Sequence, residues 1–158
     1  MNQLVRVLKI IFVVLLFTTP ILSQNTRFNN NMFLEVFGNG GAYSLNYDRV
    51  VFDDISIRLG ASLIKSEDEL VKAFPIIVNY RIYLDNNYFE VGVGTTVFTL
   101  PLNFGDFGSS NAEGALLTSV ISYCFQSAFG INGRIALTPF YYDNKFIPFG
   151  GFSIGYSF

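Results

Sequence analysis

Polar and apolar side chains alternate with a period of two along nearly the whole chain after residue 31. The terminal stretch FIPFGGFSIGYSF shows the pattern most clearly, with four apolar side chains at even positions and four small ones between them: Phe152, Ile154, Tyr156 and Phe158 against Gly151, Ser153, Gly155 and Ser157. Successive side chains of a β-strand point to opposite faces, so this stretch has one apolar face. The pattern predicts an all-β protein, and what the apolar face contacts determines which kind.

Eight segments carry this alternation, and none has the period of a long amphipathic helix. They are residues 32–39, 42–50, 54–64, 73–84, 87–100, 113–126, 128–141 and 146–158. Short turns near residues 52–54, 85–87 and 126–127 alternate with longer polar connections, KSEDELVK, PLNFGDFGSSNAE and YYDNK. This arrangement predicts a transmembrane antiparallel up-and-down β-barrel of about eight strands. If residues 32–50 form one bent strand instead, the count falls to seven.

The composition leaves few alternatives to a barrel in a membrane. Hydrophobic residues make up 51% of the chain and charged residues only 14%, against about 25% in soluble domains. After residue 23 no apolar run reaches the roughly 18 residues that a membrane helix needs. A membrane barrel and a soluble lipocalin-like barrel both remain compatible with alternation alone.

Residues 1–23 have the layout of a secretory signal peptide. Arg6 and Lys9 precede an apolar run over residues 10–17, and Pro20 ends it before a cleavage region near Ser23 or Gln24. A retained membrane anchor is the alternative interpretation. The expected organisation is a signal peptide at 1–23, a short polar segment at 24–31 and a barrel domain at 32–158. The mature chain would carry eight basic and twelve acidic residues, which argues against nucleic acid as a partner.

The faces opposite the apolar ones contain mostly Gly, Ser, Thr and Asn, with few charges. The charged residues are three acids and three arginines: Glu35, Asp48, Glu90, Arg58, Arg81 and Arg134. An eight-stranded barrel has an interior that side chains just fill, and arginine pairs well with carboxylates in such a space. We therefore predict a network of ion pairs in the lumen, with Arg81 and Glu90 brought together by the turn at residues 85–87. A conduction path or ligand site is the alternative interpretation.

Aromatic residues gather at the short-turn end of the predicted barrel. This set is Tyr47, Tyr83, Tyr88, Phe89, Tyr123, Phe125, Phe129, Tyr156 and Phe158, with Phe74, Phe140 and Phe146 expected at the other end. Such belts are typical of the two membrane interfaces. The competing explanation is that aromatic residues simply favour strands.

The sequence offers no catalytic centre. It contains no histidine, which removes the usual general base and the commonest metal ligand, and its single cysteine is Cys124. No catalytic, cofactor-binding or metal-binding residue is predicted, and the chain is not expected to be an enzyme.

The end of the chain resembles the C-terminal signal of bacterial outer-membrane barrels, in which a terminal aromatic residue follows apolar residues at alternate positions. Phe152, Ile154, Tyr156 and Phe158 match that signal. FGNGGAYSLNYDR at 37–49, SIRLGAS at 56–62 and FPIIVNY at 74–80 resemble small outer-membrane barrels of Bacteroidetes-type bacteria, close to the OmpA and OmpX type. The resemblance implies a place in the outer membrane of a Gram-negative cell envelope, contact with outer-membrane lipid and recognition by the barrel-assembly machinery.

Together these patterns predict an integral outer-membrane barrel with a packed polar lumen and a structural or surface-interaction role. A narrow, porin-like channel or a conduit for hydrophobic ligands is the alternative. No surface ligand follows from the sequence.

Overall fold

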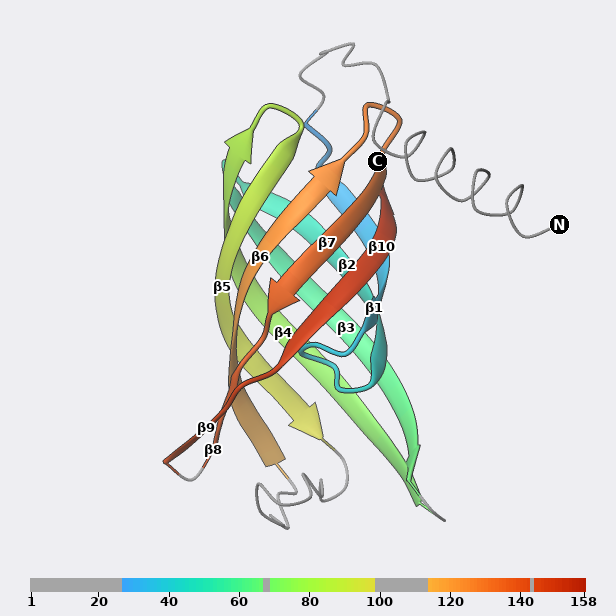
Figure 1. Ribbon diagram of the computed structural model, residues 1–158, viewed down its shortest axis with the longest axis vertical. Coiled ribbons are helices and arrows are strands. Elements are labelled where there is room, and N and C mark those ends of the chain that lie inside the picture. The colour runs from blue at the N-terminus through green and yellow to red at the C-terminus, as the bar shows by residue number, and fades with distance from the viewer. Residues whose placement is uncertain (1–26, 67–68, 99–113, 143) are drawn as a thin grey trace, which may run out of the picture.

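The computed structural model describes residues 27–66, 69–98, 114–142 and 144–158, and the structural statements below concern these residues (Figure 1). The predicted signal peptide and the whole loop PLNFGDFGSSNAE lie outside them. All regular structure in the described ranges is β, and no helix there is long and apolar enough to cross a membrane.

Ten strands form a single sheet. They are β1 (Asn30–Val36), β2 (Tyr43–Phe52), β3 (Ile55–Ser66), β4 (Glu69–Leu84), β5 (Asn87–Phe98), β6 (Gly114–Gln126), β7 (Ile131–Leu137), β8 (Phe140–Tyr142), β9 (Lys145–Ile147) and β10 (Gly150–Ser157). Each pairs antiparallel with its neighbours.

The sheet closes into a barrel of eight strands. Consecutive strands pair from β1 to β7, β7 pairs with β10, and β10 pairs with β1. The short strands β8 and β9 pair with each other and continue the β7 and β10 walls, with β8 also pairing with β6. Proline interrupts both walls, at Pro139 and Pro148, where its missing N–H cannot serve a ladder. The predicted antiparallel up-and-down barrel of eight strands is confirmed, with the seventh and eighth segments each broken once.

The two ends of the barrel differ. Turns at 53–54, 85–86 and 127–130 make the short-turn end, where Asn30 and Phe158 exchange main-chain hydrogen bonds of 3.0 and 2.9 Å. At the opposite, long-loop end, β3 and β4 remain paired as far as Ser66 and Glu69. The predicted KSEDELVK loop is therefore almost entirely strand, because main-chain pairing in a hairpin does not require apolar side chains. Residues 37–42 separate β1 from β2, so residues 32–50 are not one strand, and β1 begins at Asn30.

The apolar faces point outward and the polar faces inward. Leu59 and Val93 are 51% and 57% exposed, whereas Arg58 between outward neighbours on β3 is fully buried. Buried and exposed residues alternate along β3, β5 and β7, as the period of two predicts. The polarity of a soluble domain is thus reversed, and the lumen holds the buried side chains.

Candidate functional site in the barrel lumen

Five charged residues meet in the middle of the lumen, and we call them the ion cluster: Asp48, Arg58, Arg81, Glu90 and Arg134. Sheet register brings them together, since Asp48 is directly opposite Arg58 and Arg81 is directly opposite Glu90. Both facing pairs lie on the inward side of the wall, where their side chains have at most 2% of their surface exposed.

Every arginine of the ion cluster contacts both acids. Asp48 Oδ2 lies 3.0 Å from Arg81, 3.8 Å from Arg58 and 3.9 Å from Arg134. Glu90 lies 3.6 Å from both Arg81 and Arg134, and it forms an ion pair and hydrogen bond with Arg58. Because Arg58, Arg81 and Arg134 lie on β3, β4 and β7, each acid is connected to three strands other than its own.

Glu35, the sixth residue predicted for the network, stands apart. It is buried, but none of its contacts in the described structure is a salt bridge within 4 Å. Ser44, opposite it on β2, donates a hydrogen bond of 3.4 Å to its carboxylate. Gly38 covers the carboxylate so closely that a Cβ there would lie 2.5 Å from Cδ. Glu35 therefore belongs to the lumen but not to the ion cluster.

Two aromatic rings complete the surroundings of the arginines. Phe33 lies 4.3 Å from the Arg134 guanidinium and 5.1 Å from that of Arg58, within range of cation–π attraction. Tyr88 lies beneath Arg81 at 4.8 Å and accepts a hydrogen bond of 3.2 Å from Arg134. The assignment of Tyr88 to the outer aromatic belt was wrong, because its ring is 1% exposed inside the lumen. Alternation along β5 contained the signal, since Tyr88 shares its parity with Glu90.

A polar network fills the lumen at the short-turn end. Asn132 Nδ2 donates to Asn31 Oδ1 at 3.0 Å and to Ser157 Oγ at 2.9 Å. Ser157 Oγ in turn donates to Gln126 Oε1 at 3.2 Å. These side chains come from four strands and join the wall where β1 and β10 close the barrel.

The β1–β2 loop, residues 37–42, folds into the lumen from the other side. Asn39 is fully buried, and its side chain donates to Thr118 Oγ1 at 2.5 Å and to the Ser119 carbonyl at 3.2 Å. Thr96 donates a hydrogen bond of 2.8 Å to the Asn39 carbonyl. The loop thereby spans the lumen from β1 and β2 to β5 and β6. Alternation along the sequence gave no sign of this role.

Beyond the loop, inward-facing apolar residues pack into an apolar cluster. Its members are Val71, Ala73, Phe98, Leu116, Phe140 and Ile147, with Phe149 against them. Phe140 was expected in the outer belt, but it is 1% exposed and contacts Phe149 with ring centroids 5.8 Å apart. Phe149 also contacts Phe37 of the β1–β2 loop at 6.2 Å. This end of the lumen is therefore filled by side chains of the walls.

The outward surface carries the remaining predicted residues. Phe152, Ile154, Tyr156 and Phe158 all point away from the lumen along β10. Most of the predicted short-turn aromatics, and both Phe74 and Phe146 at the long-loop end, are also outside.

No metal centre is visible in the described part of the chain. Cys124 is buried, and no group of three or more acidic, cysteine or histidine side chains in these ranges is placed to hold a metal ion. The ion pairs and hydrogen bonds in the lumen connect the strands to one another.

A closed barrel of eight antiparallel strands, apolar outside and ionic within, is the class of protein that this geometry defines. Among solved structures, the chain is similar to the N-terminal β-barrel domain of Pseudomonas aeruginosa OprF, with a TM-score of 0.63 over 82% of this chain and 96% of that one. Sequence identity is 11%, so the likeness concerns the fold. No protein-family model and no curated protein sequence matches the chain.

Proposed function

We propose that this protein is a small integral outer-membrane β-barrel with a packed lumen, which serves envelope structure or surface interaction and catalyses no reaction. The apolar outer wall supports this proposal, because a closed sheet satisfies all its main-chain hydrogen bonds internally and can lie in hydrocarbon. The fold shared with the OprF barrel domain agrees with it. A Bacteroidetes-type origin and a cleaved signal peptide remain predictions from the sequence.

The side chains packed in the lumen are the main support for the proposal. The polar network, the ion cluster, the inserted β1–β2 loop and the apolar cluster follow one another from the short-turn end to the long-loop end. An ion crossing this lumen would have to separate ion pairs that are shielded from water, at a cost of several kcal/mol. A narrow channel or a conduit for hydrophobic ligands would need a continuous path past all four of these groups.

Conductance across a planar bilayer tests the proposal. Purified protein, shown to be folded by its heat-modifiable migration on a gel, should insert without producing discrete conductance steps. A known porin reconstituted in the same way is the positive control. Regular conductance steps from the folded protein would contradict the packed lumen, and recovery from the soluble periplasmic fraction without detergent would contradict membrane insertion.

The outward aromatic end of β10 supports recognition by the barrel-assembly machinery as the partner during biogenesis. Outer-membrane lipid is the permanent partner in this proposal.

A further inference from the structure

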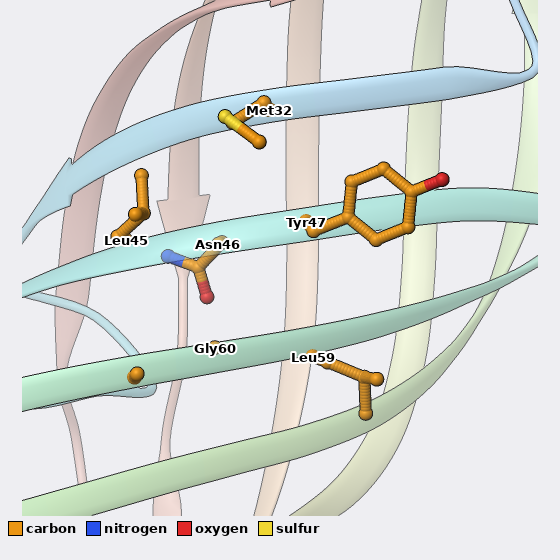
Figure 2. Close-up of a pocket in the computed structure, with 7 residues that line it drawn as sticks. Met32, Leu45, Asn46, Tyr47, Leu59 and Gly60 are labelled. Atoms are coloured by element: carbon orange, nitrogen blue, oxygen red, sulfur yellow. The ribbon is translucent and has the colours of Figure 1, made fainter.

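A groove runs along the outer wall across β1, β2 and β3. Met32, Leu45, Tyr47 and Leu59 surround it, and Ala61 lies opposite Leu45 in the β2–β3 ladder (Figure 2). Its floor is main chain of Asn46 and Gly60, whose side-chain positions face the lumen. The volume of about 260 Å³ exists because Ala61 is small where neighbouring outward positions carry leucine.

A cation lies next to the groove. The outward row of β2 runs Leu45, Tyr47, Arg49 toward the short-turn end, and the Arg49 side chain is exposed. Within the described ranges Arg49 makes no ion pair, whereas Arg27, the other arginine near this end, pairs with Asp54 at 3.3 Å and lies 4.4 Å above the Tyr83 ring. An arginine on a lipid-facing wall is costly at the bilayer midplane and nearly free at the interface. Arg49 therefore belongs at the headgroup level.

Tyr47 joins the cation to the groove. Its hydroxyl donates a hydrogen bond of 2.7 Å to Asn30 Oδ1, and Asn30 is the register partner of Arg49. The ring is thus held with its polar end toward the short-turn end and its apolar body along the groove. Amphipathic rings take this orientation at membrane interfaces.

We propose that this surface binds one glycerophospholipid of the leaflet that faces the short turns. The anionic phosphate pairs with Arg49, Tyr47 lies beside the glycerol region, and an acyl chain occupies the groove toward Ala61. The positive charge at one end of an apolar groove is what selects this occupant. The proposal rests on membrane insertion as proposed above.

Quenching of a tryptophan reporter by brominated lipid tests the proposal. The chain contains no tryptophan, so single substitutions give a clean signal. Leu59→Trp places the reporter at the groove, and Val93→Trp on β5 is the matched control with similar exposure. Each variant is reconstituted in phosphatidylcholine vesicles that contain a minor fraction of either brominated phosphatidylglycerol or brominated phosphatidylcholine.

We expect phosphatidylglycerol to be enriched about fivefold over phosphatidylcholine at the Leu59→Trp reporter, the factor that corresponds to about 1 kcal/mol for a cation near anionic lipid. The Val93→Trp control should quench equally with both lipids. Adding Arg49→Gln should abolish the preference, and adding Ala61→Phe, which fills the groove, should lower quenching while keeping Arg49.

Three outcomes overturn the proposal: equal quenching by the two lipids at Leu59→Trp, the same preference at Val93→Trp, or a preference that survives Arg49→Gln. Vesicles made only of brominated lipid separate this failure from failure of the proposed function. If neither reporter is quenched there, the protein does not lie in the bilayer at all; if both are quenched, insertion stands and only the lipid site falls.

Discussion

At the scale of single residues, two glutamates of the lumen that have the same formal charge are in different surroundings. Glu90 contacts three arginines, whereas Glu35 accepts one long hydrogen bond beneath Gly38. Removing one partner from a buried ion pair leaves an uncompensated charge, which is far more costly than losing a single hydrogen bond.

Neutralising these two acids should therefore have unequal effects. Glu90→Gln should lower the free energy of unfolding by about 3–5 kcal/mol, and Glu35→Gln by about 1 kcal/mol. Urea titration of protein in lipid vesicles, followed by heat-modifiable migration, measures both. Equal losses would mean that the ion pairs contribute nothing particular to stability.

An outward position within the wall and a position in an exposed turn should also respond differently to charge. Val93→Arg places a cation on the lipid-facing wall of β5 and should cost about 2–4 kcal/mol. Phe129→Arg, at the exposed turn between β6 and β7, should cost about 0–1 kcal/mol because a charge near the interface reaches water. The same urea titration compares them, and a Val93→Arg variant as stable as Phe129→Arg would show that β5 does not face lipid.

At the scale of elements, alternation predicted the strands and their faces but not the ends of the barrel. A period of two assigns Arg58 inward and Leu59 outward without any knowledge of neighbours. It cannot show that the β3–β4 hairpin continues beyond the closed part of the barrel. Nor can it show that Pro139 and Pro148 interrupt the strands between β7 and β8 and between β9 and β10. Tyr88 and Phe140 were assigned by residue type instead of parity, and both assignments failed. Asn39 was unpredictable, since its partners on β6 lie 79 and 80 residues away.

The β1–β2 loop should depend on Asn39 for its place in the lumen. In a Cys124→Ser background, Ser44→Cys puts a thiol under the loop, next to Glu35. Asn39→Ala should raise the rate at which a water-soluble thiol reagent modifies that cysteine by about tenfold, because losing the buried hydrogen bonds costs about 1–3 kcal/mol. Asn144→Ala, at the exposed β8–β9 turn, is the control. An unchanged rate after Asn39→Ala would show that the loop is held by other contacts.

At the scale of the whole molecule, closure depends on strands from opposite ends of the barrel domain. The β1–β10 ladder joins residues 31–36 to residues 152–157, and Asn30 with Phe158 completes it at the short-turn end. The wall cannot close until the last strand has been made, which agrees with an assembly signal in that strand.

Changing the last residue should reduce assembly more than stability. Phe158→Asp should lower the amount of heat-modifiable barrel in the outer-membrane fraction severalfold, whereas Phe129→Asp, an aromatic change on a turn at the same end, should leave it nearly unchanged. Quantitative gels of membrane fractions make the comparison. Equal yields would contradict a role for the terminal aromatic residue in recognition.

The inward fold of the β1–β2 loop leaves the rim of the barrel uneven. The β3–β4 and β8–β9 hairpins extend further than this loop in Figure 1, and the β1–β2 side forms a low sector between them. Among the described residues, a molecule approaching from the long-loop end would meet these two hairpins before it met the β1–β2 loop. Recognition from that side would therefore depend on those hairpins more than on Gly38, Asn39 and Gly40, which are buried.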